Sequence, residues 1–233
     1  MSMIVMAGIF HRCKIMAAVV AVATLTGCVT DETNTGNMIS SGPAVTGTRS
    51  PPTGDAGNEA YVRAPKWTVG SEWKYSDGYG LRVTRVEGDV TAFVRTDLAD
   101  RWLSRRGFLR EASQSGTALR QTVYRTIKPE AGKVLTVGQP LVFHREYVAN
   151  QTLRVHVTSW TVEGREKIVV PAGEFDTWLL VMRTRSLNTD WTGYERWWYS
   201  PKAQNYVRME YKYGDGPESS RVLMSFSLPQ DLG

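Results

Sequence analysis

Cysteine is nearly absent from this chain of 233 residues, and both of its cysteines, Cys13 and Cys28, lie close to the start. The chain after Cys28 therefore cannot form a disulfide, hold a metal through thiolates or use a thiol nucleophile. Neither sign of charge dominates, because 28 Lys and Arg face 23 Asp and Glu for a net charge of +5. So small an excess argues against a nucleic-acid partner, and we expect none.

Histidine is also scarce, with three residues in the whole chain. His144, Glu146 and His156 form the one grouping with metal-ligand chemistry, but they lack the spacing of a zinc motif. We therefore expect no metal and no other cofactor. No G-x-S-x-G motif is present, and a serine acting with His156 and Asp176 would use residues that any chain of this length contains. We therefore expect no enzymatic activity.

The one long apolar run extends from Ile15 to Leu25 and follows Arg12 and Lys14. It is uncharged and shorter than the roughly 20 residues that span a bilayer, which is typical of a secretory signal peptide. An ordinary signal peptide or an uncleaved anchor helix is one interpretation of this run. The tetrapeptide at its end favours a more specific interpretation.

Leu25-Thr26-Gly27-Cys28 resembles the lipobox of bacterial lipoproteins, with a leucine, two small or polar residues and a cysteine. The resemblance implies a signal peptide over residues 1–27, cleavage before Cys28 and acyl chains such as palmitate on Cys28. Two or three such chains anchor a protein stably in a membrane. Val29 follows where enteric inner-membrane lipoproteins carry aspartate, so the resemblance also implies an outer-membrane lipoprotein facing the periplasm.

The next segment is rich in Thr, Asn, Gly, Ser and Pro and has almost no large apolar residue. Such a composition buries too little surface to offset the entropy of ordering the chain. We predict that residues 28–63 comprise the lipidated cysteine and a disordered tether that holds a domain away from the membrane.

Residues 64–233 are predicted to form a single antiparallel β domain, because apolar residues there recur with period two between Gly, Pro and Asp-Gly turns. Hairpins are expected at residues 81–94 and 207–228. The apolar phase shifts near Thr158 and Ser159, which predicts a β-bulge there. Leu98 to Arg106 is the one stretch for which we expect a short helix.

Two motifs connect this domain to other proteins. V-P-A-G-x-F-x-T, from Val170 to Thr177, and W-Y-x-P, from Trp198 to Pro201, resemble motifs of uncharacterised exported bacterial β proteins. The resemblance implies one curved antiparallel sheet, a half-barrel or sandwich-like, by analogy with the lipoprotein carriers LolA and LolB. Pro171 and Gly173 predict a tight turn with a positive φ at the glycine.

Aromatic residues are abundant, with 8 Trp and 10 Tyr. Trp197 and Trp198 are neighbours in a predicted strand and must point to opposite faces of the sheet. Together with Trp160 they are candidates for the wall of a lipid or glycan site, and packing in the core is the alternative.

Arginines supply the other candidate ligand contacts. Arg183 and Arg185 could bind the phosphate of a lipid, because a guanidinium matches phosphate geometry. A second cluster is formed by Arg101, Arg105, Arg106 and Arg110. The alternative for both sets is a solvated basic face.

These observations favour a membrane-anchored cell-envelope lipoprotein that is not an enzyme and binds a hydrophobic or amphiphilic ligand or an envelope protein partner. One alternative is a structural or assembly lipoprotein whose core is filled by its own side chains. The other is an envelope hydrolase.

Overall fold

The computed structural model describes residues 61–149 and 151–229, which belong to one compact unit. The lipobox at Leu25 to Cys28 and the predicted tether up to residue 60 lie outside the described residues. β structure begins at residue 61, three residues before the expected start of the domain. Among the described residues, no helix combines the length and the apolar character that crossing a membrane requires.

Fifteen strands and one short 3-10 helix, η1 (Pro129–Lys133), make up this part of the chain. The strands are β1 (Tyr61–Arg63), β2 (Glu72–Tyr75), β3 (Gly80–Glu87), β4 (Val90–Arg95), β5 (Arg101–Arg106), β6 (Leu109–Ser115), β7 (Ala118–Gln121), β8 (Val123–Tyr124), β9 (Val134–Thr136), β10 (Leu141–Ala149), β11 (Thr152–Val170), β12 (Gly173–Ser186), β13 (Thr192–Ser200), β14 (Asn205–Tyr213) and β15 (Ser219–Ser227).

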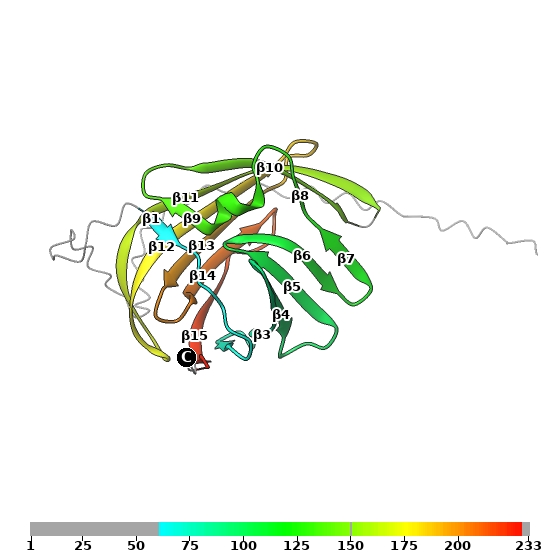
Figure 1. The fold of residues 1–233 in the computed structure, drawn as a ribbon. Coiled ribbons are helices and arrows are strands. Elements are labelled where there is room, and N and C mark those ends of the chain that lie inside the picture. The colour runs from blue at the N-terminus through cyan, green and yellow to red at the C-terminus, as the bar shows by residue number, and fades with distance from the viewer. Residues whose placement is uncertain (1–60, 150, 230–233) are drawn as a thin grey trace, which may run out of the picture. The chain divides into compact units, whose positions relative to one another are not determined.

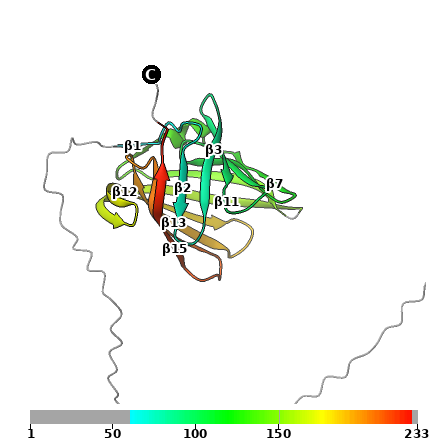
Figure 2. The same cartoon turned by 90° about the horizontal axis from the view of Figure 1, so that it is seen from below.

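Thirteen of these strands form one antiparallel sheet in the order β7-β6-β5-β4-β3-β2-β15-β14-β13-β12-β11-β10-β8. The sheet consists of two meanders that meet where β15 pairs with β2, and Figure 2 shows β15, β2 and β3 side by side. It curves strongly, so that one face becomes an interior (Figure 1). The prediction of an all-β fold with one curved antiparallel sheet is confirmed.

The two edges of the sheet are joined by a single stretch of chain. β7 pairs with β6, and β8, which follows after Thr122, pairs with β10 at the opposite edge. The main-chain N–H of Thr122 donates to Glu111 and that of Arg125 donates to His144, so the crossing segment is bonded on both sides. The sheet is therefore nearly closed into a barrel-like curve.

A separate two-stranded sheet of β1 and β9 packs beside this curve, next to η1 (Figure 1). Val62 and Leu135 from the two strands are buried, and a single parallel bridge joins Val137 to Val162 of β11. Much of the interior is filled with apolar and aromatic side chains. Trp73 and Tyr75 there donate to the main-chain oxygens of Ala203 and Tyr206, at 2.7 and 3.0 Å.

Several local predictions are confirmed. β3 and β4 form the first expected hairpin, and β14 and β15 form the second. Gly173 opens β12 with a φ of 128°, in the region that favours glycine.

Two local predictions are wrong. Leu98 to Arg106 forms no helix, because residues 101–106 pair with β4 and β6 as strand β5. The expected bulge at Thr158 and Ser159 is absent, and the register shifts between Val162 and Gly164. The apolar Leu153 and its neighbours of the same parity lie on the outer face of β11. Because β11 carries apolar residues on both faces, the switch from odd-numbered to even-numbered apolar residues in its sequence does not mark a bulge.

Candidate functional site

A cavity of about 540 Å³ lies on the concave side of the sheet. Strands from both halves of the sheet contribute to it, so its wall depends on the near closure of the barrel. Its charged and aromatic lining residues are Arg105, Phe108, Arg110, Arg120, Tyr124, Phe143, Arg145, Tyr147, Arg154, His156, Trp160, Trp191, Glu195, Trp197 and Tyr213. Aromatic and positively charged groups therefore dominate the lining.

The apolar part of the wall is formed by interlocked rings. Trp160 and Trp197 meet edge to face at 5.0 Å between ring centroids, and Phe108 lies 6.3 Å from Trp160. Tyr124 packs edge to face against Phe143 at 5.4 Å. These rings belong to the core as well as to the cavity, so this wall is rigid and pre-formed.

A β-bulge places two arginines opposite each other inside the sheet. The register between β5 and β6 shifts after Ser104, so that Arg105 lies opposite Arg110 and Glu111 is the extra residue. Arg105 is only 5% exposed, and its guanidinium carbon lies 4.7 Å from the centroid of Trp197. A third arginine, Arg145, enters from β10, where it lies opposite Tyr124.

These three guanidiniums have no carboxylate partner. Within the described residues, no hydrogen bond or ion pair joins Arg105, Arg110 or Arg145 to an acidic side chain. Burial lowers the pKa of Arg105 and of Arg145. Burial also acts against the charge of Arg110, but the field of Glu195 raises its pKa overall. All three remain charged, because a guanidinium does not lose its proton in a protein.

Glu195 is the only acidic residue among the described residues that line the cavity. Its Oε2 accepts a hydrogen bond from the indole N–H of Trp197 at 2.8 Å, and its Oε1 accepts one from the hydroxyl of Tyr213. Burial, and then Glu195, raise the pKa of Tyr213, which therefore stays a donor. Both carboxylate oxygens are thus hydrogen-bonded to Trp197 and Tyr213 and not to an arginine. The single negative charge of Glu195 can offset at most one of the positive charges.

His156 is the buried titratable group of the cavity. It is 3% exposed, stacks on Trp191 at 4.9 Å and meets Tyr147 edge to face at 5.3 Å. Burial, and then the charges of Arg145, Arg154 and Arg120, lower its pKa to about 4. His156 is therefore neutral at pH 7, and it offers polar ring nitrogens without adding charge.

Two buried polar atoms of the lining have no partner. They are Nδ1 of His156 and Nε of Arg145. Because buried polar groups in folded proteins are nearly always hydrogen-bonded, an orphaned acceptor or donor in a cavity indicates a place for a ligand or water. The two residues are cross-strand neighbours, since Arg145 lies opposite His156 between β10 and β11.

The predicted ligand-binding residues are only partly brought together. Trp160 and Trp197 line the cavity. Trp198 points to the other face of the sheet, where it is buried beneath Arg208 and donates to Glu166 at 2.9 Å. That second tryptophan is thus covered by its own neighbours.

Arg183 and Arg185 lie on the outer face of β12, because they alternate with the cavity-lining Met182 and Ser186. Arg183 pairs there with Glu163 at 3.2 Å. The structure therefore places these two arginines away from Trp160 and Trp197.

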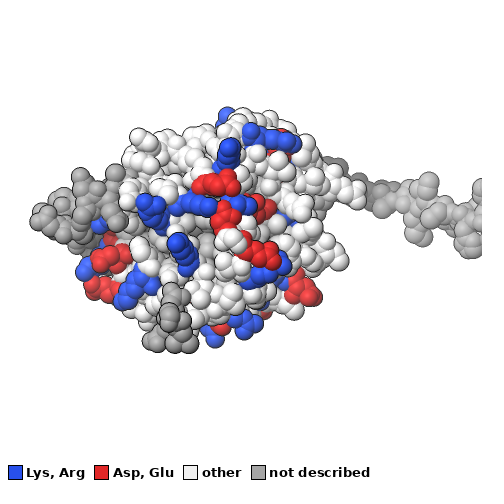
Figure 3. Space-filling view, viewed as in Figure 1, with Lys and Arg blue, Asp and Glu red and all other residues white. Residues whose placement is uncertain are grey.

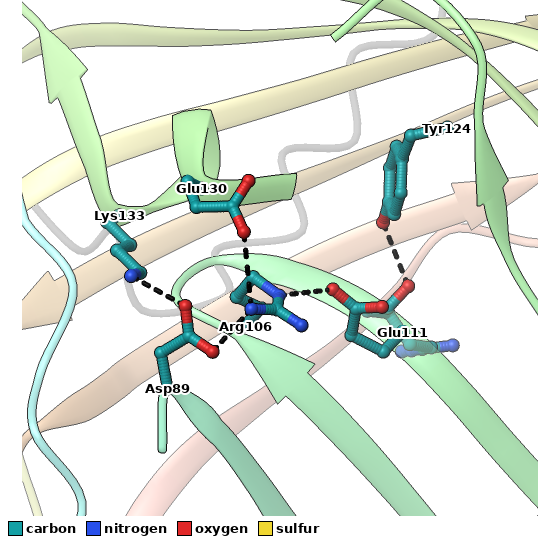
Figure 4. Close-up of polar contacts among 7 residues, drawn as sticks. Asp89, Arg106, Glu111, Tyr124, Glu130 and Lys133 are labelled. Atoms are coloured by element: carbon teal, nitrogen blue, oxygen red, sulfur yellow. Dashed lines mark hydrogen bonds and ion pairs between the residues drawn. The ribbon is translucent and has the colours of Figure 1, made fainter. Parts of the chain in front are cut away.

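The second predicted arginine cluster is divided between the two faces. Arg105 and Arg110 point into the cavity, whereas Arg106 lies in an ionic network outside it (Figure 4). Arg106 contacts Asp89, Glu111 and Glu130, and Lys133 contacts Asp89 at 2.6 Å. Figure 3 shows blue and red side chains intermingled near the middle of this face. Arg106 is thus paired with carboxylates outside the cavity, whereas Arg105 and Arg110 are unpaired inside it.

The residues considered for metal binding are not brought together. His144 and Glu146 alternate with the cavity-lining Phe143 and Arg145, so they lie on the outer face, and His156 lies inside. The catalytic combination is also separated. His156 lies opposite Ser186, and Asp176 is ten residues earlier on β12, which is roughly 33 Å of strand.

Sequence reasoning missed Arg145, Glu195 and Tyr213. One signal was present, because Arg145 stands between Phe143 and Tyr147 in the alternation of β10 and so shares their face. A charged residue in a strand usually marks the solvent side, which conceals such a position. The pairing of Glu195 with Tyr213 depends on β13 and β14 and has no local signal.

The fold and the cavity define an all-β protein with a barrel-like sheet around a polar and aromatic site. No protein-family model and no curated protein sequence matches the chain. Among solved structures, the hypothetical lipoprotein YmcC from Escherichia coli K12 aligns with a TM-score of 0.48 and 9% identity, over 70% of this chain and 85% of that one.

Two further structures align over 71% of this chain. A candidate lipoprotein from Parabacteroides distasonis has a TM-score of 0.32 and 17% identity over 98% of its length. A candidate exported protein with a YmcC-like fold from Bacteroides fragilis has a TM-score of 0.42 and 12% identity over 99% of its length. At these values nothing about activity or partners passes from these proteins to this chain.

Proposed function

We propose that this protein is a membrane-anchored cell-envelope lipoprotein that binds an amphiphilic ligand in the cavity and performs no chemical step on it. The observation that supports the proposal is the cavity itself. Its volume of about 540 Å³ lies within the range of small-molecule sites, and an apolar wall with a few converging polar groups is the usual composition of such sites.

The lining favours a ligand with two unlike parts. The rings of Phe108, Trp160 and Trp197 offer apolar surface, and Arg105 and Arg145 offer donors a short distance away. A purely apolar ligand would leave the guanidiniums buried without partners, which is costly. A purely polar ligand would gain nothing from the aromatic wall.

The alternatives have less support. A structural lipoprotein with a filled core would not need a cavity lined by unpaired arginines. A hydrolase needs a nucleophile, a base and a group that orients the base, and Nδ1 of His156 has no partner to orient it.

The envelope location in this proposal depends on the lipobox. Attachment to a membrane would occur through acyl chains on Cys28, and Val29 favours the outer membrane facing the periplasm. A lipid or a glycan that reaches this compartment is then a natural ligand.

Two adjacent tryptophans provide a matched test. Trp197→Leu and Trp198→Leu each remove an indole and one indole–glutamate hydrogen bond from β13, but only Trp197 lines the cavity. The full chain, isolated from membranes in a nonionic detergent, is examined by native mass spectrometry. We expect a discrete ligand mass on the unaltered chain and on Trp198→Leu, and its loss from Trp197→Leu.

Circular dichroism first establishes that both variants are folded. A chain that carries no ligand mass, or a mass retained equally by both variants, would contradict the proposal.

A further inference from the structure

Several arginines elsewhere in the domain have acidic partners, including one that is nearly as buried as those of the cavity. Arg221 is a close comparison, because its side chain is only 11% exposed and still reaches Asp77 at 3.0 Å. Arg106, Arg125 and Arg208 likewise contact carboxylates. Arg105 is at least as buried as Arg221 and has no carboxylate within ion-pair distance among the described residues.

The charge that is left unpaired can be counted. Five arginines line the cavity, and Arg120 and Arg154 are two of them. The other three, Arg105, Arg110 and Arg145, are the ones whose charge is opposed by burial, and they face one carboxylate, that of Glu195. Among these buried groups there is an excess of two positive charges. A group that carries about −2 at neutral pH would balance this excess, and a phosphate monoester is such a group. One carboxylate on a ligand would leave one positive charge uncompensated.

The geometry of the donors agrees with the count. Arg105 and Arg110 lie opposite each other across β5 and β6, and Arg145 comes from β10 with its Nε unpaired. Planar guanidiniums bind phosphate oxygens through pairs of parallel hydrogen bonds. The unpartnered Nδ1 of the neutral His156, which lies opposite Arg145, adds a polar contact without changing the charge.

We propose that the ligand of this cavity is an amphiphile with a phosphate monoester group, which Arg105, Arg110 and Arg145 bind together while the apolar part contacts the aromatic wall. This inference rests on the proposed function and specifies its ligand. It also explains why uncompensated charges persist in a buried site, since the phosphate neutralises them.

The test uses four probes of known chemistry on the full chain in a nonionic detergent. Octyl phosphate carries both features, octanoate has a single charge, octyl glucoside has none and inorganic phosphate lacks the alkyl chain. Isothermal titration calorimetry gives the dissociation constants. We expect octyl phosphate to bind at least tenfold more tightly than each of the other three.

Variants then assign the binding to the arginines. Arg105→Gln and Arg145→Gln should each weaken the binding of octyl phosphate at least tenfold. Arg183→Gln is the matched control, because it removes an arginine from the outer face of β12, and it should leave the affinity unchanged. A second readout does not depend on the variants. Bound phosphate should raise the pKa of His156 from about 4 in an NMR titration, because a nearby anion favours the imidazolium.

The outcomes separate the inference from the function on which it rests. Equal binding of octyl glucoside and octyl phosphate would refute the phosphate site and leave an amphiphile-binding cavity. Equal binding of inorganic phosphate and octyl phosphate would refute the amphiphile. Binding of none of the four probes would overturn both proposals.

Discussion

Arg105→Met should make the ligand-free protein more stable, although it removes a large buried side chain. The substitution replaces the guanidinium of Arg105 with an apolar group of similar length and preserves most of its packing. Replacing even a buried ion pair with well-packed apolar groups is often neutral or stabilising by about 1–4 kcal/mol, and a buried charge without a partner contributes less to the folded state than a pair does. The lost contact between Arg105 and Trp197 opposes this gain by about 1–2 kcal/mol.

The midpoints of the two ranges leave a net gain of about 1 kcal/mol in the free energy of unfolding. For a domain of this size, 1 kcal/mol shifts the melting temperature by roughly 2–4 °C, so we expect a rise of about 2–4 °C. Thermal unfolding of the full chain, followed by circular dichroism after ligand has been removed, measures this shift. Saturating octyl phosphate should stabilise the unaltered chain by at least about 1 kcal/mol more than it stabilises Arg105→Met, because the affinity of the variant is at least tenfold lower.

Arg221→Met is the matched control. Arg221 is similarly buried but is paired with Asp77, so its loss leaves a carboxylate without its partner and should lower the melting temperature. A fall in the melting temperature of Arg105→Met as large as that of Arg221→Met would refute the reasoning. It would show that Arg105 is a satisfied structural residue.

Three further predictions concern the anchor, the buried histidine and the turn. Cys28→Ala should abolish attachment to membranes, and membrane fractionation would contradict the lipid anchor if a processed form of this variant still sedimented with the membranes. The free energy of unfolding should fall by about 1–3 kcal/mol as the pH is lowered from 6.5 to 4. The reason is that His156 becomes protonated over this range in the unfolded chain, whereas in the folded chain its pKa is about 4. Urea unfolding at several pH values should show this loss of stability in the unaltered chain and not in His156→Phe. Gly173→Val should destabilise the domain by about 1–3 kcal/mol, since valine is strained at a φ of 128°, and an unchanged melting temperature would contradict this explanation.

The fold was largely predictable from the sequence, because period-two patterns and turn residues act locally. The hairpin of β14 and β15 and the turn at Pro171 are of this kind. The misplaced bulge is an error of another kind, because it occurred where the two faces of one strand are alike. On β11, apolar Leu153 and Val155 face outward while Trp160 and Val162 face inward, and no local rule distinguishes the faces.

The site was only partly predictable. Trp160 and Trp197 could be proposed as lining residues because they are aromatic. Trp198 is equally aromatic, but it is covered by Glu166 of β11 and Arg208 of β14, and its own sequence neighbourhood does not reveal this. The inward direction of Arg105 depends on the register shift between β5 and β6, which involves residues of two strands. Unpaired charge is likewise a property of the assembled cavity, because it depends on which carboxylates are absent from the neighbourhood.

The most direct test of the account is to measure phosphorus in the small molecules that co-purify with the chain from membranes. The full chain and an Arg105→Gln/Arg145→Gln double variant are purified in parallel, and their small-molecule extracts are quantified by phosphorus-31 NMR. We predict one phosphate monoester per chain in the unaltered protein, above the background of the double variant. Equal phosphorus in the two extracts, or a bound ligand that contains no phosphorus, would contradict the account.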